Sequence, residues 1–117
     1  MNRITKGETM ADINKVCITG HIGKNPEIKY FDSGKVVVNF SVAVSEWAGK
    51  EKGEITYWFD CRAWGKKAEF IGEYAKSGSL VMIDGRLGVD SYKAQDGTNR
   101  TKVYINVDEI KVVEKKK

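Results

Sequence analysis

Apolar and polar residues alternate along most of this chain, which is the pattern of β-strands that bury one side against a core. The clearest alternation runs over residues 35–47, where one side is rich in valine and the other is mixed. The side predicted to be buried carries Val36, Val38, Phe40, Val42 and Val44. The opposite and more polar side carries Val37, Asn39, Ser41, Ala43, Ser45 and Trp47.

A second strand is predicted over residues 57–64, and its two sides differ in the same way. Tyr57, Phe59, Cys61 and Ala63 form the side that we expect to be buried. The other side carries Thr56, Trp58, Asp60, Arg62 and Trp64.

The two indoles on the mixed side are the first candidate for a function. An exposed indole beside a guanidinium is a surface on which a flat ring can stack. Six residues of strand place Trp58 about 20 Å from Trp64, which suits a long ligand better than a small one. The same indoles can instead pack beneath another layer, because Trp is well buried on average. This strand alone leaves both interpretations open.

The first third of the chain contains two more extended segments. Residues 13–22 are apolar and β-branched, and Pro26 ends or bends this strand. Residues 28–31 are predicted to be extended. Asp32-Ser33-Gly34, which follows, is a sequence typical of a turn.

Two strands are predicted in the last third of the chain. In the strand over residues 80–89, the inward side is expected to carry Val81, Ile83, Leu87 and Val89. Asp96-Gly97 is a strong hairpin signal. In the strand over residues 101–113, Val103, Ile105 and Val107 are expected inward, and a bulge is predicted at Asp108-Glu109, where the alternation breaks.

One helix is predicted, over residues 66–76. Ala68, Ile71 and Ala75 follow one another at helical steps, and Phe70 and Tyr74 are expected to pair within the core. The fold class is therefore all-β with one helix: a five-stranded OB-fold Greek-key barrel with its helix between the third and fourth strands. In this fold the face of the second and third strands often binds oligonucleotides, which favours stacking for the tryptophans.

The composition agrees with one domain. The chain has 117 residues, with a formal net charge of +4 and a pI of about 9.0. We predict a disordered extension over residues 1–11, the OB-fold domain over 12–113 and a basic end over 114–117. A basic balance favours a polyanionic partner, although Lys115, Lys116 and Lys117 inflate this excess.

Catalytic and metal chemistry find little support in the sequence. The single histidine, His21, and the two cysteines, Cys17 and Cys61, lack the spacing of a zinc site or a catalytic triad. We predict no enzyme activity, no cofactor and no metal. Two free thiols and the lack of a signal peptide or membrane span indicate a reducing cytosol.

A series of short motifs runs through residues 11–113 in an order typical of one family. It includes Asn14-Lys15-Val16, Gly23-Lys24-Asn25-Pro26-Glu27-Ile28-Lys29-Tyr30, Ser33-Gly34-Lys35, Val38-Asn39-Phe40-Ser41-Val42-Ala43, Trp58, Trp64-Gly65-Lys66-Lys67-Ala68-Glu69, Gly78-Ser79 and Asp96-Gly97. In these motifs the chain resembles the bacterial-type single-stranded DNA-binding proteins. Residues 28–31 look most like cyanobacterial or plastid-related members.

The resemblance implies roles for particular residues. Bases are expected to stack on Trp47, Trp58, Trp64 and Tyr92. The predicted phosphate contacts are Lys50, Lys52, Arg62, Lys66, Lys76 and Arg86. The resemblance also implies a homotetramer, built partly through the strand over residues 13–22, which binds single-stranded DNA in replication, recombination and repair. It further implies a cytoplasmic, nucleoid-associated location, with a plastid or the cytoplasm of a phage-infected host as alternatives.

The chain departs from the family pattern at three places. Residues 88–92 are less basic than the segment that usually precedes the hairpin aromatic, and Phe59 stands where the family often has His. The family's acidic tip is not found after residue 113, where the sequence is Glu-Lys-Lys-Lys. Partners recruited through that tip are therefore not expected.

Two alternative functions compete with sequence-tolerant DNA binding. One is an OB-fold module for protein interaction or oligomerisation, whose aromatic residues are buried at subunit contacts. The other is an enzyme that uses Asp60 or Asp84, for which the sequence offers little.

Overall fold

The computed structural model describes residues 11–114. In this part of the chain it contains six strands and one helix: β1 (Val16–Ile22), β2 (Glu27–Tyr30), β3 (Val36–Trp47), β4 (Glu54–Trp64), α1 (Lys66–Tyr74), β5 (Leu80–Lys93) and β6 (Asn99–Glu114). The extension predicted over residues 1–11 and the basic end predicted over 114–117 lie outside the described residues, apart from Ala11 and Glu114.

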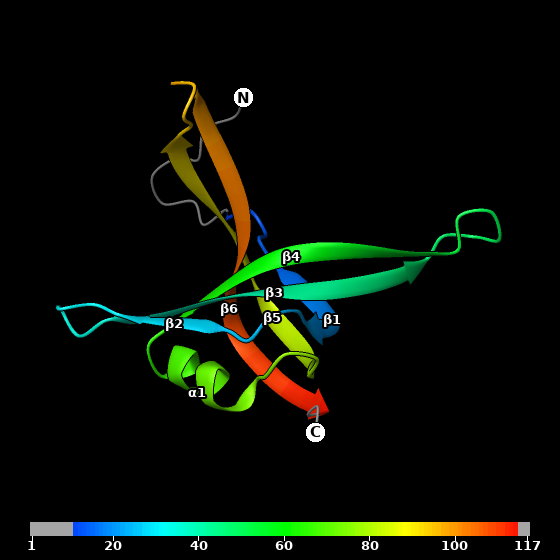
Figure 1. Cartoon of the computed structure of the whole chain (residues 1–117), viewed down its shortest axis with the longest axis horizontal. Helices are drawn as coiled ribbons and strands as arrows, with labels where there is room; N and C mark the ends of the chain where they lie inside the picture. Colours follow the sequence, from blue (N-terminus) through cyan, green and yellow to red (C-terminus); the bar gives the residue numbers. More distant parts are fainter. Residues whose placement is uncertain (1–10, 115–117) are drawn as a thin grey trace.

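Five of the strands close into a barrel (Figure 1). The hydrogen-bonded order is β1-β5-β6-β4-β3-β2, and an additional pairing of β1 with β3 completes the circle. All pairs are antiparallel except β4 with β6, which pair in parallel at two positions, Cys61 with Ile105 and Arg62 with Asn106. This is the predicted OB-fold, with its helix in the predicted place. The short β2, expected only as an extended path, pairs with the first half of β3.

The core fills the barrel from the sides that the alternation indicates, except that Val37, expected on the more polar side of its strand, is also buried. In β3, Val36, Val38, Phe40 and Val42 are buried, and Val38 and Val42 have no exposed surface. Side chains from every other barrel strand pack against them. The remaining members of this buried cluster are Ile22, Cys61, Ala63, Ala68, Ile71, Ala75, Val81, Ile83, Ile105 and Val107.

The helix contributes small side chains to this core. Ala68, Ile71 and Ala75 are fully buried, as predicted, although the helix ends at Tyr74 rather than at residue 76. Phe70 and Tyr74 pair as expected, with ring centroids 5.0 Å apart. Their predicted burial is wrong: both rings are 42% exposed, and Phe70 lines a surface hollow beside β6 and not the core.

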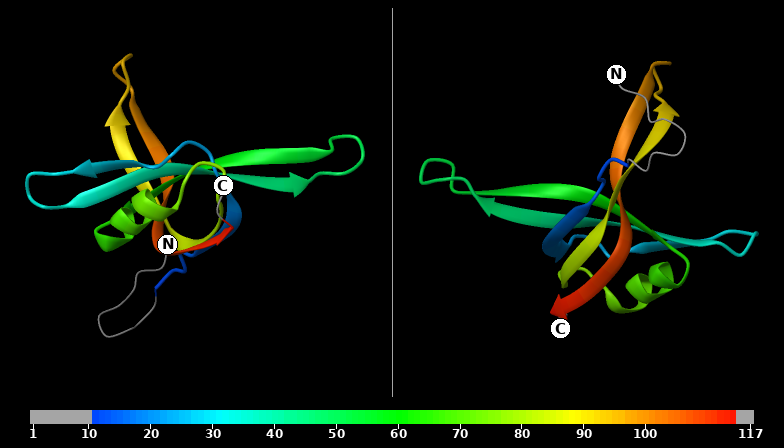
Figure 2. Two further views of the ribbon diagram at one scale, coloured as in Figure 1. Left: turned by 60° about the horizontal axis from the view of Figure 1, so that its bottom comes forward. Right: turned by 180° about the vertical axis from the view of Figure 1, so that it is seen from behind.

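Two hairpins extend well beyond the barrel, in different directions (Figures 1 and 2). One is formed by β3 and β4, and the other by β5 and β6. Five residues on the inward-facing sides of these strands, predicted to be buried, are exposed: Tyr57, Phe59, Leu87, Val89 and Val103. Alternation continues along each strand after the barrel has ended, so these side chains have no opposite wall to pack against. We call these five residues the apolar overhang.

The irregularities predicted near the C-terminus are confirmed. In the β5–β6 pairing, Asp84 is opposite Glu109 and Gly85 is opposite Val107, so Asp108 is the extra residue of a bulge. The hairpin at Asp96-Gly97 is closed by a hydrogen bond of 2.9 Å from the Ala94 amide to the Thr98 carbonyl. Between residues 11 and 114, no helix has the length and apolar character needed to cross a membrane.

The two thiols differ in exposure, and this leads to a first prediction. Cys17 is exposed, whereas burial, assisted by the nearby Asp60 charge, raises the pKa of Cys61 to about 12. Because the thiolate is the reactive form, Cys61 should be inert at pH 8 while the chain is folded. We expect Ellman's reagent to titrate one thiol per native chain and two after denaturation. Rapid reaction of a native Cys17→Ser variant would contradict this assignment.

Candidate nucleic-acid interface

The outward sides of β4, β5 and β6 form one continuous surface with exposed aromatic residues. The alternation of β4 places Trp58, Arg62 and Trp64 on this side. The pairing of β5 with β6 places Gly88 opposite Tyr104, and Tyr92 opposite Arg100. We call this surface the aromatic face, and it also includes the adjoining outward residues of β3.

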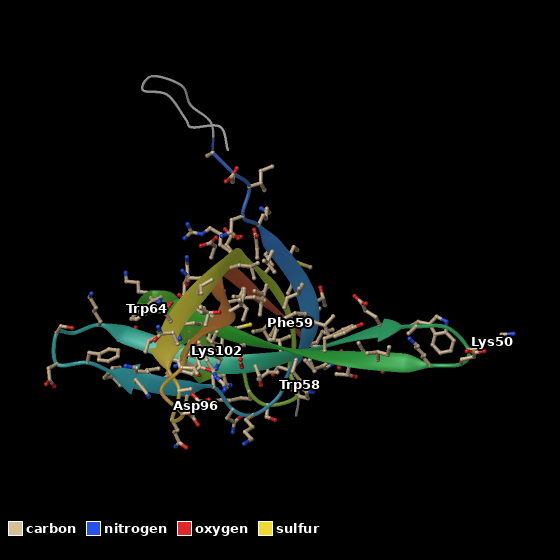
Figure 3. All side chains as sticks on the ribbon, turned by 90° about the horizontal axis from the view of Figure 1, so that it is seen from above. Lys50, Trp58, Phe59, Trp64, Asp96 and Lys102 are labelled. Carbon is tan, nitrogen blue, oxygen red and sulfur yellow. The ribbon has the colours of Figure 1, made fainter. Side chains whose placement is uncertain are left out.

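The three tryptophans are exposed, so none of them is packed under a layer formed by residues 11–114. Trp47 is 72% exposed, Trp58 62% and Trp64 44%. Trp47 is opposite Glu54, where β3 meets the loop, and Trp64 is the last residue of β4, just before α1. Figure 3 shows Trp58 and Phe59 on opposite sides of β4, with Lys50 at the tip of the β3–β4 hairpin.

The Trp58 indole is supported from below by the chain that follows β1. A Cβ atom on Gly23 would lie 2.7 Å from a carbon of this ring, so only glycine allows the indole to approach so closely. The Gly23 amide donates to the Ser41 carbonyl at 3.0 Å, which fixes this backbone against β3. Trp58 therefore has one side against the protein while most of its surface remains open.

Arg62 lies between the two indoles of β4 and is held by three neighbouring strands. Its Nε donates to Asn39 Oδ1 at 3.2 Å. Its Nη1 and Nη2 donate to the two carboxylate oxygens of Asp90 at 3.3 and 2.7 Å. The guanidinium carbon lies 4.0 Å from the centroid of the Tyr104 ring. These contacts come from β3, β5 and β6, so the Arg62 side chain connects β4 to the other three strands of the aromatic face.

The protonation states of this cluster follow from the same contacts. The hydrogen bond from Arg62 is the main cause that holds the pKa of the Asp90 carboxyl below its ordinary value. The same bond raises the pKa of Arg62 above its already high value, against a smaller opposing effect of burial. Both groups therefore stay charged throughout the neutral pH range.

A polar groove with a volume of about 200 Å³ lies beside Arg62 on the aromatic face. Of the residues that line it, only Arg62 is among the predicted binding residues, and Lys102 and Tyr104 are the two on β6 that were not predicted. The signal was available in the alternation of β6, because residues 102 and 104 are opposite in parity to the inward Val103 and Ile105. The groove is lined by Lys24, Asn25, Glu27, Asn39, Phe40, Ser41, Asp60, Cys61, Arg62, Lys102 and Tyr104.

The structure does not gather the predicted phosphate contacts at one place. Lys50 and Lys52 lie in the loop between β3 and β4, at the far end of that hairpin (Figure 3). Lys66 begins α1 and lines a different hollow of about 450 Å³, together with Phe70 and the β6 bulge. Lys76 donates to the Gly72 carbonyl at 2.8 Å. Arg86 pairs with Asp108 of the bulge at 3.4 Å.

Tyr92, the fourth predicted stacking residue, lies near the end of the β5–β6 hairpin and is 49% exposed. It shares the outward side of β5 with Gly88 and Asp90. In the same hairpin, hydrogen bonds from the Thr98 side chain and amide are the main causes that lower the pKa of Asp96. No group of His, Cys, Asp and Glu side chains within residues 11–114 is arranged to hold a metal ion.

A closed barrel of OB topology with exposed aromatic residues on the outward side of β4 is the architecture of an oligonucleotide-binding protein. Comparison with known proteins agrees with this class. Residues 13–113 match the model of the single-strand binding protein family.

Curated relatives share this likeness over most of the chain. A protein of Synechocystis named Single-stranded DNA-binding protein 1 is 42% identical over 106 residues, 90% of this chain and 87% of its own length. Single-stranded DNA-binding protein 2 of Nostoc is 37% identical over 102 residues and is covered to 78%. A single-stranded DNA-binding protein of Neisseria meningitidis is 38% identical over 104 residues, and the match spans 60% of its length.

The chain therefore belongs to the single-strand binding protein family, as the motifs in its sequence indicate. Members of this family are binding proteins and not enzymes, which excludes the enzyme that the sequence analysis weighed at Asp60 or Asp84.

Proposed function

We propose that this chain binds single-stranded DNA with little dependence on sequence, and that it protects such strands during replication, recombination and repair. The observation that carries the proposal is the exposure of Trp47, Trp58 and Trp64 along one face of an OB-fold barrel. Every base has a flat face, so stacking on indoles tolerates any sequence. Family membership and the names of the relatives support the choice of ligand.

Cations beside the aromatic face are proposed to neutralise phosphates. Lys50 and Lys52 lie on an exposed hairpin loop, where they are free to follow a strand that crosses the indoles. Lys66, Lys76 and Arg86 remain candidates for the remainder of the path. Binding of this kind weakens as salt rises, with a slope of about −0.7 for each phosphate neutralised on a single strand.

The same proposal includes assembly into a homotetramer and a cytoplasmic, nucleoid-associated location. Two features of the described residues support the assembly. β1 pairs with β3 only at His21 and Ile22, so within residues 11–114 its other edge from Val16 to Gly20 has no strand partner. The apolar overhang is a second exposed surface of the kind that subunit contacts bury.

The apolar overhang also supports the alternative function, an OB-fold module for protein interaction that does not contact DNA. A fluorescence titration separates the two. Addition of an oligo(dT) strand is expected to quench the intrinsic tryptophan emission strongly, because bases would stack on exposed indoles. An unchanged spectrum at saturating strand would favour the interaction module.

Replacement of a stacking indole gives the second test. Base–aromatic stacking contributes about 1–3 kcal/mol per base, so Trp58→Ala or Trp64→Ala should weaken binding about five-fold or more. Both side chains are exposed, so the far-ultraviolet circular dichroism should not change. Phe70→Ala is the matched control, since Phe70 is an exposed ring on α1, outside the aromatic face. Equal losses in all three variants would contradict the proposed site.

Light scattering tests the proposed assembly. At micromolar concentration the molar mass is expected to be four times that of the 13.1 kDa chain. Phe59→Asp places a charge in the apolar overhang and should reduce this mass if the overhang is a subunit contact. A monomeric wild-type chain would contradict the tetramer and leave the proposal of DNA binding intact.

A further inference from the structure

The Arg62 side chain is the top of a three-layer stack. The bottom layer is Gly88 of β5, where a Cβ atom would lie only 2.4 Å from Cζ of Tyr104. The Tyr104 ring is the middle layer and lies down against this glycine. The guanidinium of Arg62 covers the ring, 4.0 Å from its centroid. The stack exists because residue 88 has no side chain.

The edge of the guanidinium is occupied by the protein itself. Asp90 accepts from both terminal nitrogens in a bidentate pair, and Asn39 accepts from Nε. Bidentate pairing fixes the plane of a guanidinium as well as its position. A phosphate that approached this edge would have to displace Asp90, whose charge is already compensated by Arg62. Arg62 is therefore poorly arranged for the phosphate contact that the sequence analysis assigned to it.

The flat side of the same group remains available. With its inner side on Tyr104 and its edge on Asp90 and Asn39, the guanidinium lines the polar groove of the aromatic face. Its side chain is 23% exposed. A guanidinium plane is a surface on which a nucleic-acid base can stack, in the same way as an aromatic ring.

We propose that the outer side of the Arg62 guanidinium is a base-stacking platform, located on β4 between the indoles of Trp58 and Trp64. The inference rests on the proposed function and identifies a further contact of that surface. The strand spacing places Arg62 about 13 Å from Trp58 and about 7 Å from Trp64. The platform fills the interval between two indoles that are too far apart to hold adjacent bases.

The test compares two ligands of equal charge: oligo(dT), and a deoxyribose-phosphate chain of the same length without bases. Arg62→Lys keeps the charge and removes the plane. We expect this variant to bind oligo(dT) about three- to ten-fold more weakly than the wild type, with an unchanged salt slope. Its affinity for the chain without bases should equal that of the wild type.

Arg100→Lys is the matched control. Arg100 lies on β6, the strand of Tyr104. Its Nη2 is 3.2 Å from Oδ2 of Asp96. Among the described residues, Arg62 is the one cation found over a ring. We expect Arg100→Lys to bind both ligands as the wild type does.

Four results would overturn the inference. Wild-type affinity of Arg62→Lys for oligo(dT) would mean that no base uses the plane. An equal loss of affinity of Arg62→Lys for both ligands would identify a phosphate contact. A salt slope that is smaller by about 0.7 in Arg62→Gln than in the wild type would identify the same contact. A wild-type chain that binds neither ligand would overturn the proposed function as well, so the two failures are distinguishable.

Tyr104→Leu is a second variant, in case the substitution at Arg62 prevents folding. It removes the ring that supports the guanidinium and leaves every charge in place. We expect weaker binding of oligo(dT) and unchanged binding of the chain without bases. The double variant Arg62→Lys/Tyr104→Leu should lose no more affinity than the weaker-binding of the two single variants, because the same platform is removed in each case. Wild-type affinity of a folded Tyr104→Leu variant would contradict the platform.

Discussion

The parallel pairing of β4 with β6 is the contact on which the rest of the structure depends. It consists of two positions, Cys61 with Ile105 and Arg62 with Asn106, and without it the sheet would have two open edges. Cys61 and Ile105 are both buried and join the core at this seam. Arg62 points the other way and reaches Asn39, Tyr104 and Asp90. This ladder, as short as that of β1 with β3, is thus reinforced by apolar packing on its inner side and by a network of polar contacts on its outer side.

The length of the strands explains why the barrel has exposed apolar surface. β3 and β4 have 12 and 11 residues, and β5 and β6 have 14 and 16. A small barrel encloses only part of such strands, so the remainder continues as two-stranded hairpins. A hairpin has no opposite sheet, and side chains on both of its sides meet solvent. The same excess length that exposes Phe59 therefore also carries Trp47 and Tyr92 away from the barrel, where a long ligand can reach them.

The extent of sequence-based prediction follows from this geometry. The burial of Val38 and Val42, the helix after Trp64 and the bulge at Asp108 were all predicted, because each depends on neighbours a few residues away. The exposure of Tyr57 and Leu87 was not predicted, since alternation carries no information about where a barrel ends. The partners of Arg62 were not predicted either. Asp90 is 28 residues away in sequence, and the space for Tyr104 depends on a glycine in a third strand.

The ion pairs of the barrel indicate which of its cations can readily bind a phosphate group. Lys15, Arg86 and Lys102 each pair with an aspartate of another segment of the chain, and their side chains are between 56% and 67% exposed. Exposed pairs contribute little to stability and are screened by salt, so these cations can exchange a carboxylate for a phosphate at small cost.

Arg62 differs from these three cations in its exposure, its pairing and its surroundings. Its side chain is 23% exposed, its pairing is bidentate and a ring lies beneath it. Breaking this arrangement would leave Asp90 without its partner and Tyr104 without its cover. Lys15, Arg86 and Lys102 are consequently suited to follow a phosphate backbone, while the fixed plane of Arg62 is suited to the flat face of a base.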